Sequence, residues 1–154
     1  MTVFLENIRS VFNVGSVFRT ADATAVEKLI LAGYTGFPPH KGITKTALGA
    51  ENSVTWEHTK EILATADHLQ KTHELAVIET STHAVDLFDW VPRFPVCVVF
   101  GSEVDGVTPE LLARCDTHVR IPMLGQKHSL NVSTSAGVVL YELLRKYRNL
   151  LKTT

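Results

Sequence analysis

The stretch that decides the fold is Val96-Cys97-Val98-Val99-Phe100-Gly101-Ser102-Glu103-Val104-Asp105-Gly106. Five consecutive apolar residues that run into a glycine-bounded loop are typical of a strand buried on both faces of a parallel sheet. Open α/β sheets bind their ligands in the loops that follow the carboxyl ends of such strands. The stretch therefore predicts a central parallel strand followed by a ligand-binding loop.

A second loop and a long helix follow this strand. His118-Val119-Arg120-Ile121 reads as a short strand, which leads through a polar segment to Ser129-Leu130-Asn131. Apolar residues then recur with a helical period to the end of the chain: Val132, Ala136, Val139, Leu140, Leu143, Leu144 and Tyr147. Asn131 is thus expected at the start of a C-terminal helix, beside a second functional loop.

Strand and helix patterns also alternate upstream. Short apolar runs predict strands at Val3-Phe4-Leu5, Lys28 to Ala32, Val54-Thr55-Trp56 and Leu75 to Ile78. Helices are expected after Asn13, from Thr59 to about Gln70, and after Thr108. This alternation predicts an α/β fold with a mainly parallel sheet flanked by helices. A chain of 154 residues fits one domain, residues 1–154.

Local signals define these elements further. Asn13 is the expected N-cap of the first helix, whose apolar stripe is Val14, Val17, Phe18, Ala21 and Ala25, and Arg19 lies off that stripe. Thr59 and Thr108 are expected as caps of later helices, the second followed by Pro109. Residues 34–53 lack a clear period and predict a functional loop with a short helical turn.

Composition sets limits on function. Hydrophobic residues make up 45% of the chain and charged residues 20%, which is ordinary for a globular protein. The formal net charge of −1 argues against binding to nucleic acid through bulk charge. We find no secretory signal and no transmembrane run, and expect a cytoplasmic protein with no membrane partner. Cys97 and Cys115 are expected to be reduced core residues.

Familiar ligand motifs are missing. The loop from Gly101 to Gly106 is followed by Val107-Thr108 and so lacks the Lys-Ser/Thr pair of a phosphate loop. No Gly-x-Gly-x-x-Gly follows the first strand, which argues against a Rossmann dinucleotide site. The seven histidines show no metal-ligand spacing, so no metal site is expected.

Three ordered segments nevertheless resemble the motifs of the SpoU, or TrmH, family of RNA ribose methyltransferases. The first motif is similar to Glu6-Asn7-Ile8-Arg9-Ser10-Val11-Phe12-Asn13-Val14-Gly15-Ser16-Val17-Phe18-Arg19-Thr20-Ala21-Asp22. The second resembles Phe100 to Val107. The third resembles Ile121-Pro122-Met123 together with Ser129-Leu130-Asn131-Val132-Ser133. The resemblance covers nearly the whole chain, and three motifs in order are more specific than one glycine pattern.

The resemblance implies a SPOUT-type α/β domain with a C-terminal trefoil knot, S-adenosylmethionine as cofactor, and a homodimer. The family's catalytic positions match Asn13, Arg19, Glu103, Ser129 and Asn131. Cofactor contacts are implied for loop residues at three places: Thr80, Ser81, Gly101, Ser102, Glu103, Gly106, Ile121, Met123, Leu124, Ser129 and Leu130.

The implied reaction is methyl transfer to a ribose 2′-oxygen of RNA. The chain shows neither the N-terminal RNA-binding domain common in family members that act on ribosomal RNA nor the terminal helices of several transfer-RNA enzymes. Transfer RNA is the expected substrate and ribosomal RNA the alternative; DNA is not expected. A non-catalytic RNA-binding protein that keeps the fold, or a different nucleotide-binding α/β enzyme, are the rival hypotheses. Because a guanidinium is a poor base, Arg19 is expected to stabilise the 2′-oxyanion or to bind the neighbouring phosphate.

Overall fold

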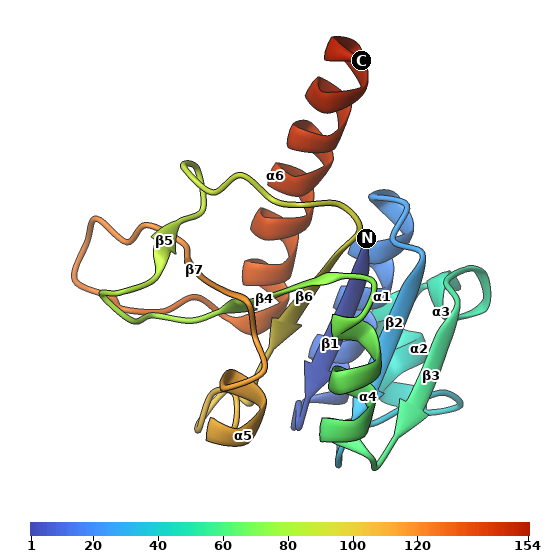
Figure 1. Cartoon of the computed structure of the whole chain (residues 1–154). Helices are drawn as coiled ribbons and strands as arrows, with labels where there is room; N and C mark the ends of the chain where they lie inside the picture. Colours follow the sequence, from blue (N-terminus) through green and yellow to red (C-terminus); the bar gives the residue numbers. More distant parts are fainter.

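The computed structural model describes residues 1–154 as one seven-stranded sheet with helices on both faces (Figure 1). The strand order is β3-β2-β1-β6-β4-β7-β5, and every neighbouring pair is parallel. The strands are β1 (Thr2–Glu6), β2 (Lys28–Ala32), β3 (Trp56–Thr59), β4 (Glu74–Ile78), β5 (Val85–Asp86), β6 (Val96–Phe100) and β7 (Thr117–Arg120). The helices are α1 (Val11–Ala23), α2 (Lys41–Ala47), α3 (Ala50–Ser53), α4 (Ile62–Gln70), α5 (Pro109–Leu112) and α6 (Val132–Thr153). The predicted α/β fold with a parallel sheet is confirmed.

The core lies on both faces of the sheet because side chains alternate along each strand. In β6, Val96, Val98 and Phe100 pack in the cluster that includes α1 and α6. Cys97 and Val99 pack in the cluster on the other face, against α4 and α5. All five β6 residues are buried, as the continuous apolar run predicts. Cys97 and Cys115 are both free thiols.

The start of α1 differs from the prediction. The helix begins at Val11, and its N-cap is Ser10, whose hydroxyl accepts a hydrogen bond from the Asn13 backbone N–H at 3.2 Å. The assignment of Asn13 as the cap was therefore wrong, and the side chain of Asn13 is left available for other contacts. Ala25 was also misplaced on the helical stripe: α1 ends at Ala23, and Ala25 is exposed with a φ of 55°.

Other differences arise where pairing between distant segments sets the boundary. β3 pairs with β2 over residues 56–59, two residues later than the predicted strand at 54–56. Thr59 therefore ends a strand, and Glu61 rather than Thr59 is the N-cap of α4. Residues 34–53 contain two helices, α2 and α3, rather than one turn. The two-residue strand β5 was not predicted, because it exists only through its pairing with β7.

The connection between β4 and β6 is held against α6. Lys146 Nζ donates hydrogen bonds to the backbone oxygens of Leu87, Phe88 and Trp90. The buried Glu74 accepts from the Trp90 indole at 3.1 Å and from the Thr117 hydroxyl at 2.7 Å. The bonds from Lys146 hold residues 87–90 of this connection against the C-terminal helix. None of the helices combines the length and apolar character that crossing a bilayer requires.

Candidate functional site

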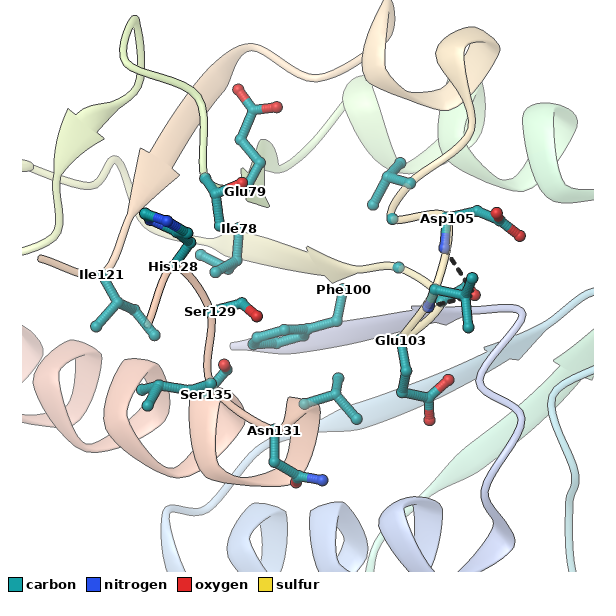
Figure 2. Close-up of a pocket in the computed structure, with 18 of the residues that line it drawn as sticks. Ile78, Glu79, Phe100, Glu103, Asp105, Ile121, His128, Ser129, Asn131 and Ser135 are labelled. Atoms are coloured by element: carbon teal, nitrogen blue, oxygen red, sulfur yellow. Dashed lines mark hydrogen bonds between the residues drawn. The ribbon is translucent and has the colours of Figure 1, made fainter. Parts of the chain in front are cut away.

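The carboxyl ends of β4, β6 and β7 meet the start of α6 at a pocket of about 790 Å³. This is the edge where the predicted ligand loops leave the sheet, and parallel α/β folds place their sites there. Figure 2 shows the Phe100 ring beside Ser129, with Asn131 at the first turn of α6. The two loops that the sequence singled out therefore line one pocket.

Most of the predicted site residues line this pocket. They come from the second and third motifs and from the loop after β4: Thr80, Ser81, Gly101, Ser102, Glu103, Gly106, Ile121, Met123, Ser129, Leu130 and Asn131. Leu124 is absent from the lining and is 100% exposed. Asn13 and Arg19 also lie outside the lining, on α1.

Several lining residues were not predicted. Ile78 and Phe100 are the last residues of β4 and β6, and Glu79 directly follows β4. Ser135 lies one helical turn after Asn131, on the same side of α6. The signal was present in each case: these residues directly adjoin a predicted ligand loop or lie one turn from a predicted site residue. The apolar part of the lining also includes Val104, Val107, Leu112 and Val132.

The loop after β6 closes on itself. The Gly106 N–H donates to the Ser102 backbone oxygen at 2.9 Å, and the Ser102 hydroxyl accepts from the N–H groups of Val104 and Asp105 at 3.2 and 3.4 Å (Figure 2). A Cβ on Gly101 would lie 2.2 Å from the nitrogen of Val107. Glycine is therefore required at 101, because the backbone of the returning loop occupies the space of a side chain.

The far end of this loop is anchored to β1. Glu6 is only 1% exposed, and its carboxylate accepts from the Thr108 N–H at 2.8 Å and from the Thr108 hydroxyl at 2.6 Å. Thr108 occupies the N-cap position of α5, as predicted, but its side chain makes no cap hydrogen bond. The hydroxyl instead links the loop to the sheet.

A chain of hydrogen bonds connects the three motifs. Asn131 caps α6 through its Oδ1, which accepts from the N–H groups of Ser133 and Thr134 at 2.9 and 3.4 Å. Its Nδ2 therefore points away from the helix and donates to Asn13 Oδ1 at 3.4 Å. Asn13 Nδ2 in turn donates to Glu103 Oε1 at 3.1 Å. Each amide orientation determines the next, so the Glu103 carboxylate, Asn13 and Asn131 form one directed network.

The network holds Glu103 ionised. Partial burial alone would raise the pKa of this carboxyl. The backbone N–H groups of Glu103, Arg9 and Ser10 and the amide of Asn13 stabilise the charged form, and the net result is a pKa below the usual range. The Arg9 N–H lies 3.2 Å from Glu103 Oε2. A carboxylate that is already fully charged suits a positioning role better than proton transfer near neutral pH.

The side chains of Arg19 and Ser129 form no hydrogen bonds within the chain. Arg19 is exposed and forms no salt bridge or side-chain hydrogen bond within the chain. It lies six residues beyond Asn13, or about 9 Å along a helix that rises ~1.5 Å per residue. Ser129 lines the pocket and is exposed. Both side chains are thus available to a bound molecule.

The pocket has an unusual balance of charge. Three carboxylates line it, those of Glu79, Glu103 and Asp105, and no lysine or arginine does. A pocket of this kind does not suit a triphosphate or a pyrophosphate, which proteins bind with cations and backbone N–H groups. No group of three His, Cys, Asp or Glu side chains is placed to hold a metal ion.

Comparison with known proteins agrees with these motifs. The sequence model of the SpoU rRNA methylase family matches residues 1–141. The chain belongs to this family. A SpoU-type fold accounts for the parallel sheet and for the placement of all three motifs at one edge.

Similar SpoU/TrmH proteins are known in sequence and structure. A Staphylococcus haemolyticus protein assigned to the TrmH family of tRNA/rRNA methyltransferases is 30% identical over 144 residues, covering 94% of this chain and 58% of that protein. The SpoU methyltransferase AviRb from Streptomyces viridochromogenes, crystallised with AdoMet, superimposes with a TM-score of 0.88 and 26% identity over 96% of this chain and 57% of its own. A chain from a structural study of the 2-OH methylation of C/U34 on tRNA gives a TM-score of 0.87 and 26% identity, with 96% of each chain covered. The chain thus spans somewhat over half the length of the curated relatives it matches.

Proposed function

We propose that this protein transfers a methyl group from S-adenosylmethionine to a ribose 2′-oxygen of RNA, with transfer RNA as the substrate. The observation that carries the proposal is the hydrogen-bonded network of Asn131, Asn13 and Glu103 at the rim of the pocket. It joins one residue from each of the three family motifs, which are far apart in the sequence. Membership of the SpoU family supports the reaction class.

The residues of the pocket fit S-adenosylmethionine. A volume of about 790 Å³ lies within the ~300–1,000 Å³ of small-molecule sites. Ile78, Phe100, Ile121 and Leu130 offer apolar surface for an adenine ring, and the carboxylates at the rim suit a positively charged ligand. The same balance of charge disfavours ATP and NAD, the ligands expected of a different nucleotide-binding enzyme.

When bound, S-adenosylmethionine would supply an electrophilic methyl group on its sulfonium sulfur, and breaking the S–CH3 bond would release a neutral thioether, which is a good leaving group. The protein must then hold a ribose in line with that group, and such positioning can lower a barrier by ~7–11 kcal/mol. Asn13 and Asn131 present amides in fixed orientations next to the pocket, and Glu103 fixes them. The Ser129 hydroxyl forms a hydrogen bond with the cofactor or with the target ribose. Arg19 binds the phosphate beside the target ribose or stabilises the developing 2′-oxyanion, for which its planar guanidinium is suited.

Transfer RNA is favoured over ribosomal RNA by one similarity. A chain studied for the 2-OH methylation of C/U34 on tRNA superimposes on this one with a TM-score of 0.87. Nucleotide 34 of tRNA is therefore the first position to test. A cytoplasmic location follows from an RNA substrate of this kind.

A homodimer is part of the proposal. The last turns of α6 extend beyond the sheet (Figure 1). The helix exposes apolar side chains from its middle to its end: Tyr141, Tyr147, Leu150 and Leu151. An obligate dimer would bury roughly 2,000 Å² or more in total. Sedimentation at micromolar concentration tests this, with Leu150→Glu and Leu151→Glu expected to shift the protein to monomer. A monomeric parent protein would contradict it.

We also propose the trefoil knot that the family resemblance implies. The support is the segment 79–95, which Lys146 holds against α6 through three backbone oxygens. A chain stretched mechanically from its two ends would then extend less than an unknotted chain of 154 residues, because a tightened knot retains some of its length. Full extension would refute the knot.

Mapping ribose methylation tests the proposed function directly. Total RNA from cells with and without the protein is compared, and purified protein is then added back with S-adenosylmethionine. We expect one or a few tRNA nucleotides to lose their methyl group without the protein and to regain it on addition. Methylation confined to ribosomal RNA would change the substrate. Tight cofactor binding without any RNA methylation would support the non-catalytic alternative.

A further inference from the structure

The first turn of α1 carries an exposed aromatic ring that the network does not use. Phe12 directly precedes Asn13, and its side chain is 51% exposed. Consecutive helical residues point about 100° apart, so this ring lies on a different face of α1 from the Asn13 amide. Core packing therefore does not account for a phenylalanine at this position, one residue from the network at the pocket rim.

Helix α2 brings a cation to the same ring. Lys45 Nζ lies 5.9 Å from the centroid of Phe12, within the range of a cation–π contact. The Thr46 hydroxyl donates to the Phe12 backbone oxygen at 2.8 Å. A Cβ on Gly15 would lie 2.0 Å from Thr46 Oγ1 and 2.4 Å from the Ile43 oxygen. The glycine thus allows α2 to pack directly on α1, which fixes the position of Lys45.

The exposed face of α2 carries two lysines whose charges have no carboxylate partner. Lys41 and Lys45 lie four residues apart, on one side of the helix. Together with Pro39, His40 and Thr44 they line a surface hollow of about 390 Å³ that contains no carboxylate. Neither lysine forms a salt bridge. Two like charges at this spacing repel each other weakly, and a bound anion would relieve that repulsion.

We propose that Phe12, Lys41 and Lys45 form a binding surface for the RNA nucleotide next to the one that is methylated. The ring stacks on its base, and the two lysines bind its flanking phosphates. Single-stranded RNA is recognised in this way, by aromatic stacking combined with cations along the backbone. The position of this surface relative to the network supports the proposal. Phe12 directly precedes Asn13 in α1, so a ribose held at the network would bring the base of the adjacent nucleotide to the Phe12 ring. The inference rests on the proposed function, because it assumes an RNA substrate.

The experiment measures binding of a fluorescent, unmodified tRNA transcript by anisotropy at several salt concentrations. Phe12→Ala should weaken binding about 5- to 100-fold, the range for loss of one stacked base. Phe12→Tyr, which keeps a ring, should bind like the parent, whereas Phe12→Leu should not. Lys41→Ala and Lys45→Ala should each reduce the salt dependence by about one counterion.

Matched controls separate this surface from general effects. Phe88→Ala removes another exposed ring, 61% exposed and far along the chain, and Lys71→Ala removes a cation at the end of α4; both should leave RNA binding unchanged. Affinity for S-adenosylmethionine should stay at the parental value in every variant, which shows that the fold is intact.

Three results would overturn the inference. If the parent binds the transcript and Phe12→Ala binds it equally well, the surface is wrong while the proposed function stands. If Phe12→Leu binds like the parent and Phe12→Ala sediments as a monomer, the ring belongs to an interface with a second copy. If the parent neither binds nor methylates RNA, the proposed function fails and this inference fails with it.

Discussion

Replacing Gly101 with alanine tests how the ligand-binding loop is built. The added Cβ would lie 2.2 Å from the Val107 nitrogen, and 2.3 and 2.6 Å from the carbon and oxygen of Gly106. All three are backbone atoms, so no side-chain rotation can relieve the overlap. To reach an ordinary contact of ~3.5 Å, the two ends of the loop must separate by about 1.3 Å. Overpacking of this kind costs ~1–3 kcal/mol.

The loss should appear in cofactor affinity. Separating the loop ends weakens the bond from the Gly106 N–H to the Ser102 oxygen, now 2.9 Å long, and displaces residues of the loop that line the pocket. Loss of two hydrogen bonds to the cofactor, at ~0.5–1.5 kcal/mol each, corresponds to a roughly 5- to 150-fold weaker Kd for S-adenosylmethionine. Isothermal titration calorimetry measures this Kd, and a thermal melt of the same sample reports the folded fraction.

Gly137→Ala is the matched control. A Cβ at Gly137 meets no atom within 4 Å, and alanine is favoured over glycine in a helix by ~0.5–1 kcal/mol. This variant should bind the cofactor like the parent and melt at the same or a higher temperature. A Gly101→Ala protein with parental Kd would refute the placement of the cofactor in this loop.

Three further predictions concern the residues around the pocket. Arg19→Ala should leave cofactor affinity nearly intact while single-turnover methylation of RNA collapses, because loss of a transition-state contact lowers kcat and kcat/KM together. Arg19→Lys should restore little of the activity. If Arg19→Ala turns over within several-fold of the parent, Arg19 is not a catalytic residue. The pKa of Glu103 is lowered in the folded state, so its stabilising contribution is complete above the unfolded value of ~4.3 and is lost as the pH falls through the lower folded value. Urea midpoints should accordingly favour the parent over Glu103→Gln at pH 7 and converge in strong acid, and a difference that persists unchanged in acid would contradict this. Thr108→Val removes the hydroxyl that donates to the buried Glu6 at 2.6 Å and should lower the free energy of unfolding by ~1–3 kcal/mol, whereas Thr108→Ser should stay near the parent.

Local patterns in the sequence were sufficient for most strands and for the longer helices. The continuous apolar run of β6 predicted burial on both faces, and the period of α6 predicted its inward residues, of which Val132, Ala136, Val139, Leu140 and Leu143 are buried. These predictions succeed because burial follows directly from the spacing of apolar side chains. The two ligand loops were likewise located, since a loop after a buried parallel strand must leave the same edge of the sheet.

The predicted element boundaries were wrong where two nearby residues were equally good caps or where a distant segment sets the boundary. Asn13 and Ser10 are both good caps by type, and only the observed start of α1 at Val11 selects Ser10. β5 is too short to give a pattern and forms because β7 pairs with it. The hydroxyl of Thr108 bonds Glu6 rather than its own helix, a contact between residues 102 positions apart.

Sequence alone indicated which residues are candidates for the chemistry, but their arrangement required the tertiary structure. Gly101, Glu103, Ser129 and Asn131 were identified from the motifs they resemble, and each lines the pocket. The structure alone decided that Asn13 links Glu103 to Asn131, across sequence separations of 90 and 118 residues, and that Lys45 lies over Phe12. Period and propensity describe how a segment meets its own neighbours along the chain. Contacts of this kind depend on how α1, α2 and α6 pack against the sheet, and that packing is a property of the whole folded chain.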